Sequence, residues 1–520
     1  MGTCLSPGNL AFQKSVTSDI YVDKSQLIDY TNSVINKKNQ NICVCRPRRF
    51  GKSTDAQMLA AYYDESCDSS ALFNHLRIST TDTYQEHLNK YNVILLDIQK
   101  FLSQTHSIPE MIQLLNDFLV WELLKEYKDI DYFDQSNLTM VLENIHNEKQ
   151  ISFVFIVDEW DCIFREFKDD HDAQEKYLDF LRLMFKEQSY TSLVYMTGIL
   201  PIKKYGTISA LNMFDEFSMI DPYPLTSFMG FTDEEVKQLC CSYQMDFEEM
   251  KHWYNGYHLE EHQSIYSPRS VITSIRKKRF GNYWTQTETY EALKIYIDRN
   301  TEGLKDCIIE LLAGEQVKIN TDTFVNDMTT INGKDDVLTL LVHLGYLGYD
   351  IRKKTVYIPN KEVRSSFIAA TTTKRYDQVN KTLRYSEDLL KATWNMDQDA
   401  VAEYIEFAHL ETSILQYNDE NALSYTLSLA YFTARDEYTI IRELPSGKGF
   451  ADLVFLPIAD RPAMIIELKW DQAAETASKQ IKEKTYDFGL EKYKDRLLLV
   501  GINYNKSTKK HTCVIEKYNR

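Results

Sequence analysis

The sequence predicts an α/β fold, and three patterns carry that prediction. Residues 1–200 alternate short apolar runs with longer stretches of helical periodicity, such as the one from about Met111 to Leu124. The runs near 152–157 and 192–196 are almost continuously apolar, which suits central strands of a parallel sheet covered on both faces. A second α/β pattern follows near the C-terminus. The expected strands are 41–45, 92–98, 152–157, 192–196, 438–444, 450–456, 463–468 and 496–502, with a helix at 472–487.

The region between these two patterns has a different character. Thr232-Asp-Glu-Glu235 forms a capping box that predicts the start of a helix. Residues 337–360 predict a helix and then a hairpin turning near 352–354, a winged-helix-like unit that serves equally well as a lid or a packing module. At roughly 150 residues per domain, 520 residues fit three or four domains. We expect divisions at 1–220, 221–375 and 376–520, the last beginning with a helical stretch from about 376 to 434.

Composition limits the classes of protein to which the chain can belong. The net charge of −17 argues against sequence-independent coating of nucleic acid, because that affinity depends on Lys and Arg. Residues 471–520 carry eleven Lys and Arg against seven Asp and Glu, so a polyanion fits best there. The longest apolar runs are far shorter than the roughly 20 residues that span a bilayer, so no membrane segment is expected. Nine Cys without a C-x-x-C pair, and no secretion signal, predict a reducing, cytoplasmic location.

The first candidate site follows the strand NICVC, where the chain reads RPRRFGKST. This run ends in Gly51, Lys52, Ser53 and Thr54. A strand, a tight loop and a helix beginning at Lys-Ser place backbone N–H groups around an anion. Lys52 can then reach the β- and γ-phosphates of a nucleotide, and the Ser53 hydroxyl can bind Mg²⁺. Arg46 stands where the standard pattern has its first Gly. With Arg48 and Arg49, it is expected to add positive charge where a triphosphate would lie.

An acidic pair supplies the partner that such a loop needs. Asp158 and Glu159 directly follow the apolar run FVFIV, and so are expected at the carboxyl edge of the sheet, where open α/β sheets bind ligands. Asp158 would hold the metal ion and Glu159 would polarise the attacking water. Thr197 ends the next strand and could contact the γ-phosphate. Alone, an acidic pair after a strand is commonly a solvated loop and a strand-end Thr is commonly structural, so this interpretation depends on the GKST loop.

Motifs over roughly the first 290 residues resemble the bacterial AAA-ATPase-like family. They are IYVDKSQLI (20–28), ICVCRPRRFGKST (42–54), MLAAYYD (58–64), FIVDEWD (155–161), MTGI (196–199), HWYNGYHL (252–259) and NYW (282–284). The family's own loop carries Arg at the first Gly position. The resemblance implies a P-loop NTPase domain, a parallel sheet with helices on both faces, that binds and hydrolyses ATP with Mg²⁺. The expected ATP-binding residues are Arg49, Gly51, Lys52, Ser53, Thr54, Asp158 and Thr197.

The second candidate site lies in a predicted hairpin, GKGFADLVFLPIADRPAMIIELKW. If its strands pair about a centre between Ala459 and Asp460, the numbers of any two opposite residues add up to 919. Asp452 then faces Glu467 on one side of the hairpin. Lys469 lies two residues after Glu467 and shares its face. Facing carboxylates repel each other unless a cation binds between them, and Mg²⁺ prefers such oxygen ligands. An E-x-K pair alone fits an ordinary surface hairpin, but the facing Asp favours a metal site that activates water at a phosphodiester.

Residues 400–520 resemble the PD-(D/E)XK nuclease superfamily, in the form often fused behind this ATPase family. The residues that match its D…E-x-K motif are Asp452, Glu467 and Lys469. The resemblance implies a restriction-endonuclease-like α/β domain that cleaves DNA or RNA with Mg²⁺. It assigns Gln480, at the start of the following helix, as a supporting polar residue. A further metal-binding Glu is expected before the first strand; Glu420 fits best by position, and Glu411 competes with it.

Two interpretations of the whole chain stay open. In the first, an ATP-driven switch or motor is coupled to a Mg²⁺-dependent nuclease, which explains why both sites keep their chemically necessary residues. In the second, a regulatory or signalling ATPase uses the nuclease-like domain only as a binding module, which the overall acidity favours. A purely structural protein explains neither Lys52 nor the facing acids. The oligomeric state is open too: a neighbouring subunit of a homo-oligomer can complete such ATP sites with an Arg, but no Arg can be assigned that role.

Overall fold

The chain divides into two compact units, each with its own sheet and core. The computed structural model describes residues 2–202, 204–205, 208–209, 211–260, 263–284, 289–297, 302–324, 333–371, 377–411, 426–428, 430–446, 449–457, 461–470, 491–505, 507–508 and 510–518. The first unit comprises Met1–Thr287 and Lys318–Val363. The second comprises Glu288–Val317 and Arg364–Arg520.

A five-stranded parallel sheet forms the centre of the first unit. Its order is β2-β3-β4-β1-β7, and each neighbouring pair runs parallel. The strands are β1 (Asn41–Cys45), β2 (Asn92–Asp97), β3 (Phe153–Asp158), β4 (Thr191–Gly198) and β7 (Asp215–Phe217). The first four confirm the strands expected from the sequence, whereas β7 is too short to give an apolar run. Strands β1, β3 and β4 are buried along their whole length, which explains their unbroken apolar sequences.

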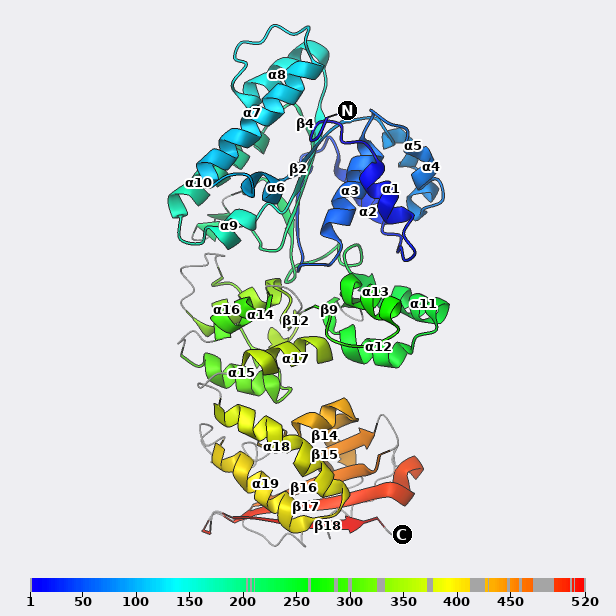
Figure 1. Cartoon of the computed structure of the whole chain (residues 1–520), viewed down its shortest axis with the longest axis vertical. Helices are drawn as coiled ribbons and strands as arrows, with labels where there is room; N and C mark the ends of the chain where they lie inside the picture. Colours follow the sequence, from blue (N-terminus) through cyan, green and yellow to red (C-terminus); the bar gives the residue numbers. More distant parts are fainter. Residues whose placement is uncertain are drawn as a thin grey trace. The chain divides into compact units, whose positions relative to one another are not determined.

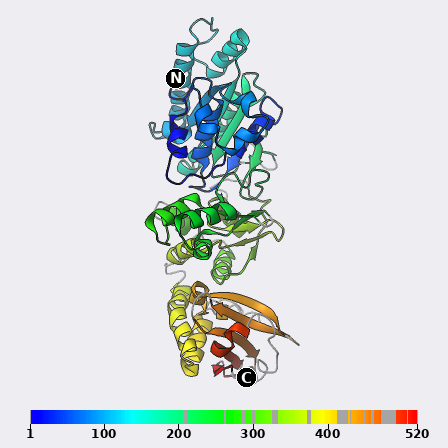
Figure 2. The ribbon, with the colours of Figure 1, turned by 90° about the vertical axis from the view of Figure 1, so that its right-hand side faces the viewer.

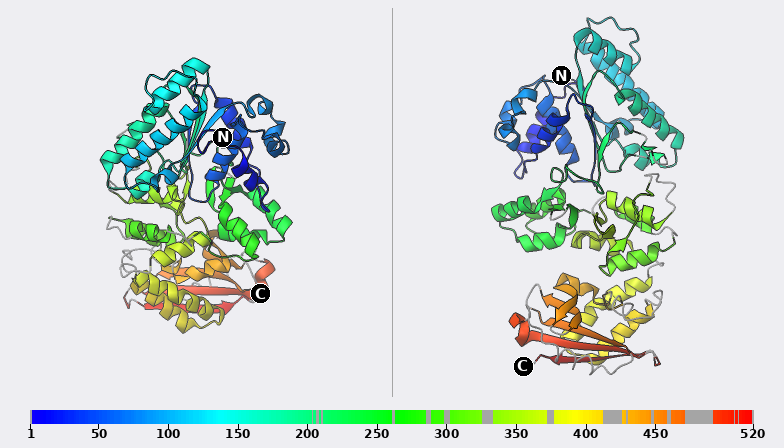
Figure 3. Two further views of the ribbon diagram at one scale, coloured as in Figure 1. Left: turned by 45° about the horizontal axis from the view of Figure 1, so that its top comes forward. Right: turned by 180° about the vertical axis from the view of Figure 1, so that it is seen from behind.

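Helices cover both faces of this sheet, as Figure 1 and both views of Figure 3 show. On one face lie α1 (Leu10–Val16), α2 (Gln26–Val34), α3 (Lys52–Tyr63), α4 (Ser70–Phe73) and α5 (Tyr84–His87). On the other side lie α6 (Ile98–Leu102), α7 (Ile108–Glu126), α8 (Leu138–Lys149), α9 (Cys162–Glu166) and α10 (His171–Phe185). Buried side chains of α2 and α3 pack against alternate sheet residues such as Val44 and Ile156. The α/β class predicted for this half of the chain is confirmed.

Shorter elements complete the first unit. They are β5 (Lys204–Tyr205), β6 (Ile208–Ser209), β8 (Phe231–Thr232), α11 (Asp233–Tyr243), α12 (Phe247–Tyr254), β9 (Tyr257–Glu260), β10 (Gln263–Tyr266), α13 (Pro268–Lys277), α16 (Lys334–His343), β12 (Gly348–Asp350) and β13 (Thr355–Tyr357). The predicted capping box opens α11, because the Glu235 N–H donates to the Thr232 hydroxyl and the Thr232 N–H donates to the Glu235 carboxylate. Helix α16 and the antiparallel pair β12 and β13 confirm the expected helix and hairpin.

A five-stranded mixed sheet forms the core of the second unit. Its order is β14-β15-β16-β17-β18, with β16 and β17 parallel and the other pairs antiparallel. The strands are β14 (Tyr438–Ser446), β15 (Gly449–Pro457), β16 (Ala463–Trp470), β17 (Leu497–Asn505) and β18 (Lys510–Lys517). Helices α18 (Asp377–Trp394) and α19 (Gln398–Glu411) cover one face of this sheet (Figure 2). The α/β class is therefore confirmed here as well, and the helix expected at 472–487 lies outside the described residues.

The remaining elements of the chain are short or join the two units. Helices α14 (Thr289–Ile297) and α15 (Leu304–Leu312) and the 3-10 turns η3 (Phe432–Asp436) and η4 (Glu491–Arg496) belong to the second unit. Strand β11 (Val317–Lys318) and helix α17 (Lys361–Ala370) each contain a boundary between the units. None of the nine cysteines, all of which lie in the described ranges, forms a disulfide bond. Within the described ranges, no helix has both the length and the apolar composition that a membrane crossing requires.

Candidate functional sites

The loop between β1 and α3 has the tight geometry that its sequence predicts. Gly51 immediately precedes α3 and adopts a φ of 100°, a left-handed conformation that glycine reaches without strain. Arg49 also has a positive φ, 71°. The first turn of α3 therefore begins directly after a sharp reversal, and its N–H groups without helical partners face the loop. This is the anion-binding arrangement expected from the RPRRFGKS sequence.

Lys52 folds back over the loop that precedes it. Its Nζ donates hydrogen bonds to the carbonyl oxygens of Arg46 and Pro47, each at 3.0 Å, and only 4% of the residue is exposed. Burial lowers the pKa of Lys52, while the nearby carboxylates of Glu159, Asp161 and Asp158 act in the opposite direction. The ammonium group is thus fixed beside the loop, with acidic side chains close by.

Asp158 and Ser53 meet at the edge of the sheet. Asp158 ends β3 and lies opposite Thr197 of β4. Its carboxyl group is buried, and burial raises its pKa to about 6, while a hydrogen bond with the Ser53 side chain lowers it. A hydroxyl and a desolvated carboxylate are hard oxygen ligands, so the pair fits the Mg²⁺ ion that the sequence implies. A bound cation would also offset the cost of burying this charge.

Glu159 and Thr197 are held by neighbours. The Glu159 carboxylate pairs with the guanidinium of Arg165, which also contacts Asp161 at 3.2 Å. Glu159 itself has a φ of 55°, in the left-handed region where side chains other than glycine are strained. The Thr197 hydroxyl is fully buried and donates to the carbonyl oxygen of Val44 at 3.1 Å. Their predicted roles with the attacking water and the γ-phosphate stay predictions.

The expectation that Arg46 adds charge at a triphosphate is wrong. Its side chain is completely buried, and its Nη1 donates to the carbonyl oxygens of Cys45, Phe217 and Ser218 at 2.9, 3.1 and 3.0 Å. Burial lowers its pKa to about 10. The guanidinium therefore ties the end of β1 to the end of β7, and cannot be identified with a phosphate ligand. Arg49 instead extends to the carbonyl oxygen of Tyr283, at 3.4 Å.

Replacing Arg46 by Met is expected to lower the free energy of unfolding by about 2–4 kcal/mol, because three buried carbonyls lose a charged donor. Urea titration of the full chain measures this change. Lys38→Met, at an exposed position just before β1, serves as the control and should change stability by less than about 0.5 kcal/mol. Equal stability of the two variants would contradict a structural role for Arg46.

A buried glutamate organises the segment around the NYW motif. Glu362, in the first turn of α17, accepts hydrogen bonds from the N–H groups of Tyr283 at 2.6 Å and Trp284 at 2.9 Å, and from the Ser270 hydroxyl at 2.8 Å. It is 2% exposed, and burial raises its pKa to about 7 despite these bonds. Arg49 exerts a weaker opposing effect on this pKa. Glu362 thereby connects α13 and the NYW segment with the neighbourhood of the phosphate loop.

Glu362→Gln is expected to change how stability depends on pH. A carboxyl group whose pKa is higher in the folded chain binds its proton more tightly there. Its contribution to the free energy of unfolding is therefore complete below the unfolded pKa of about 4.5 and declines as the pH rises to 7. The stability of the wild type relative to this variant should fall by up to about 3 kcal/mol between pH 4.5 and 7. Urea titrations at several pH values measure it, and parallel pH profiles would contradict it.

The second predicted site also comes together in the structure. Strand β15 pairs with β16 through Leu453 with Ile466, Val454 with Ile465 and Phe455 with Met464. Each pair sums to 919, which confirms the predicted register and makes Asp452 and Glu467 the next opposing positions. Leu453 and Ile466 face the core beneath α18 and α19. Because side chains alternate along a strand, Asp452, Glu467 and Lys469 share the opposite face of the sheet.

Direct contacts tie Asp452 to the backbone of β16 and Lys469 to Glu467. The Asp452 carboxylate accepts a hydrogen bond from the Leu468 N–H at 2.7 Å. Lys469 Nζ lies 3.8 Å from Glu467 Oε2, and the side chain of Glu467 is only 1% exposed. Two carboxylates beside one lysine offer oxygen ligands that fit Mg²⁺. Gln480 and Glu420 lie outside the described residues, and Glu411 is the last residue of α19. Among the described residues, no three His, Cys, Asp or Glu side chains gather into one metal-binding group.

Comparison with protein families matches the two sites to two domains. Residues 10–208 match the family described as predicted AAA-ATPase, AAA-ATPase-like. Residues 419–513 match the PD-(D/E)XK nuclease superfamily. The chain therefore carries an AAA-ATPase-like domain and a PD-(D/E)XK nuclease superfamily domain. Both resemblances inferred from the sequence motifs are confirmed, in the predicted order. The phosphate loop with Lys52 lies in the first, and the Asp452 and Glu467 hairpin lies in the second.

Individual proteins that resemble this chain are distant relatives. An uncharacterized protein in the vnfD 5′ region of Azotobacter chroococcum mcd 1 is 22% identical over 284 residues, which are 52% of this chain and 51% of that protein. The chain thus spans about half the length of this curated relative. AMPPCP-bound DnaA from Aquifex aeolicus is 10% identical, with a TM-score of 0.24 over 57% of this chain and 81% of DnaA. Cdc6p from Pyrobaculum aerophilum is 8% identical, with a TM-score of 0.22 over 69% and 97% of the respective chains.

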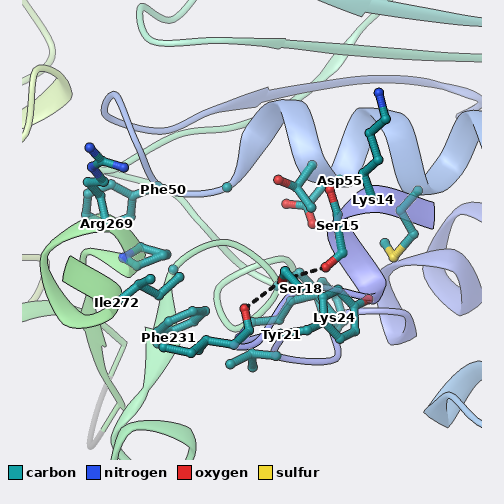
Figure 4. A pocket seen from close by; sticks show the side chains of 18 of the residues that line it. Lys14, Ser15, Ser18, Tyr21, Lys24, Phe50, Asp55, Phe231, Arg269 and Ile272 are labelled. Carbon is teal, nitrogen blue, oxygen red and sulfur yellow. Dashed lines mark hydrogen bonds between the residues drawn. The ribbon is translucent and has the colours of Figure 1, made fainter. Parts of the chain in front are cut away.

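A pocket beside the phosphate loop contains residues that the sequence analysis missed. It encloses about 360 Å³ next to the AAA-ATPase-like domain's GKST segment, and Gly51 and Thr54 line it. Its further lining residues include Tyr21, Asp55, Met58, Phe231, Arg269 and Ile272. Figure 4 shows Arg269, Phe50 and Ile272 at one end and Asp55 and Ser15 at the other. The IYVDKS motif, which supplies Tyr21, was the available signal, but sequence spacing alone does not place it against α13.

Proposed function

We propose that this chain binds and hydrolyses ATP at the AAA-ATPase-like domain and cleaves DNA or RNA phosphodiesters at the nuclease-like domain, each with Mg²⁺. One observation carries the proposal: in each domain a motif lysine lies close to a buried motif carboxylate, Lys52 near Asp158 and Lys469 near Glu467. Structural proteins have no need to bury such groups together, because burying charge destabilises the fold unless a ligand or partner compensates.

At the ATP site, each described residue has a distinct role. Lys52 exchanges its two carbonyl partners for the β- and γ-phosphates, and the first amides of α3 bind the same phosphates. Ser53 and Asp158 hold Mg²⁺, which when bound neutralises phosphate charge. Glu159 orients the attacking water once it leaves Arg165. The 360 Å³ pocket receives the base, with Arg269 at its wall. Thr54 and Arg49 flank the phosphates, and Thr197 contacts the γ-phosphate.

At the nuclease site, Asp452 and Glu467 hold Mg²⁺, which when bound lowers the pKa of a water molecule and neutralises phosphate charge. Lys469, 3.8 Å from Glu467, positions that water and stabilises the charge that develops on the phosphodiester. We assign Gln480 and Glu420 supporting and metal-binding roles on the resemblance alone. The excess of basic residues in 471–520 favours a nucleic acid as the polyanion.

The deciding experiment is an assay of the purified wild type on single- and double-stranded DNA and RNA, with and without ATP and Mg²⁺. ATP hydrolysis together with Mg²⁺-dependent cleavage supports the proposal. ATP hydrolysis without cleavage of any of the four substrates supports the alternative, a regulatory ATPase whose nuclease-like domain only binds, which the net charge of −17 favours. Failure to bind ATP would overturn both.

We further propose a cytoplasmic location, where nine cysteines without disulfide bonds stay reduced. We also propose a homo-oligomeric state, which sedimentation would test.

A further inference from the structure

Asp55 is a buried acid with an unused oxygen in the pocket beside the phosphate loop. It belongs to the first turn of α3, is 4% exposed and lines the pocket. Its Oδ2 accepts no hydrogen bond from any of the described residues. Figure 4 shows its side chain on the α3 side of the pocket, across from Phe231 and Ile272. A buried carboxyl oxygen without a hydrogen-bond partner weakens a fold, so its retention calls for a ligand.

A second aspartate at the end of the same helix provides the contrast. Asp64 is completely buried, and its two oxygens accept hydrogen bonds from the N–H groups of Gly8 at 2.7 Å and Ser66 at 2.9 Å. Asp64 is therefore a satisfied structural acid. The nearby cation Lys24 does not complete Asp55 either, because its Nζ bonds to Glu235 at 2.6 Å and to the Ser227 carbonyl at 2.7 Å.

The walls of the pocket indicate which donor Asp55 would meet. Tyr21, Met58, Phe231 and Ile272 supply apolar and aromatic surface suited to a flat heterocycle. The pocket adjoins the start of α3, where the phosphates of a nucleotide would lie, so the base of that nucleotide could reach it. In a mainly apolar pocket, a few polar groups fix the orientation of the ligand. An oxygen acceptor matches the amino group on the edge of adenine, which is a hydrogen-bond donor.

We propose that Asp55 accepts a hydrogen bond from the 6-amino group of adenine and so selects ATP over triphosphates that lack this group. The inference rests on the proposed nucleotide-binding function of the same site. The Asp55 carboxyl group is thus a specificity-determining group, whereas Lys52 and Ser53 bind phosphates and metal that every nucleoside triphosphate shares. This selectivity for ATP lowers the stability of the ligand-free protein, because the Asp55 oxygen stays buried without a donor.

The test measures equilibrium binding of the full chain, with Mg²⁺, to ATP and to purine riboside 5′-triphosphate, which has the same ring system without the amine. We expect the wild type to bind ATP roughly 10-fold more tightly than purine riboside 5′-triphosphate, which is the effect of one hydrogen bond to a buried acceptor. Asp55→Asn keeps an acceptor oxygen and should keep this preference. Asp55→Leu has a similar shape without an acceptor, and should bind both triphosphates equally. Asp64→Asn, the matched control, should keep the wild-type ratio.

Each remaining outcome decides the question. An Asp55→Leu variant that still prefers ATP over purine riboside triphosphate overturns the proposal. The proposal also fails if the substitution changes only the preference for ATP over 2′-deoxy-ATP, because Asp55 would then contact the ribose. Without nucleotide, Asp55→Leu should melt at or above the wild-type temperature and Asp64→Asn below it. An Asp55→Leu variant that melts lower or does not fold shows that Asp55 is structural, and overturns the inference. If the wild type binds neither triphosphate, the proposed nucleotide function itself has failed.

Discussion

Lys52→Ala is expected to reduce the rate of ATP hydrolysis by at least about 100-fold, the effect of removing a fixed donor from a site of developing charge. The side chain is already immobilised beside the loop by the carbonyls of Arg46 and Pro47, so little ordering is needed when phosphates replace them. No other described lysine of the first unit is part of the GKST loop. Steady-state phosphate release at saturating Mg²⁺ measures the change.

Two measurements separate this loss from simple unfolding. Lys38→Ala removes an exposed lysine from the same unit and should leave hydrolysis unchanged. A thermal melt of Lys52→Ala without nucleotide should show a folded protein, because the cost of leaving the Arg46 and Pro47 carbonyls without this donor is partly offset by removing a charge whose burial is unfavourable. A Lys52→Ala protein that is folded and hydrolyses ATP at the wild-type rate would place the catalytic centre elsewhere in the chain.

Strands and their register could be predicted because their physical causes are local. The runs in β1, β3 and β4 are unbroken because these strands are buried on both faces, and burial selects apolar residues at every position. The pairing register of β15 and β16 follows from the midpoint of the hairpin turn, and it places Asp452 opposite Glu467. Sequence therefore predicts a site well when its residues lie on one hairpin.

Arg46 shows why the direction of a loop side chain could not be predicted. The sequence places three arginines beside a phosphate loop, and charge alone suggests that all three face the phosphates. The structure instead buries Arg46 against carbonyls of β1 and of Phe217 and Ser218, residues at the end of β7 and just beyond it. Phe217 and Ser218 lie 171 and 172 residues from Arg46, so no local pattern reveals these two acceptors. Long-range backbone acceptors decide the orientation.

The pocket could not be predicted for a related reason. Its walls come from the segment before α2, from α3 and from α13, which lie far apart in the sequence. Each segment has an ordinary local explanation: Tyr21 and Phe231 suit a core, and Asp55 suits the first turn of a helix. Only their convergence, with one oxygen of Asp55 unpaired, distinguishes a binding wall from a core.

Glu467→Gln is expected to lower Mg²⁺-dependent cleavage of nucleic acid by at least about 1,000-fold while ATP hydrolysis stays at the wild-type rate. The substitution keeps the shape of a side chain that is 1% exposed and removes one of two charges that would hold the metal. Lys469→Ala should show a similar loss, because it removes the cation beside the reacting phosphate. Cleavage of a labelled duplex and a labelled single strand, followed over time, measures both.

A control variant and a stability measurement make this result specific to the site. Lys510→Ala, at an exposed position of β18, should cut normally. Without metal, Glu467→Gln should melt at or above the wild-type temperature, because facing carboxylates repel each other. Adding Mg²⁺ should then stabilise the wild type more than the variant, which keeps only the proposed Ser53 and Asp158 site, since a ligand that binds the folded state raises its melting temperature. Because this shift needs no nucleic acid, Mg²⁺ that stabilises both proteins equally would contradict a metal site at Asp452 and Glu467, even if the natural substrate were missing from the assay.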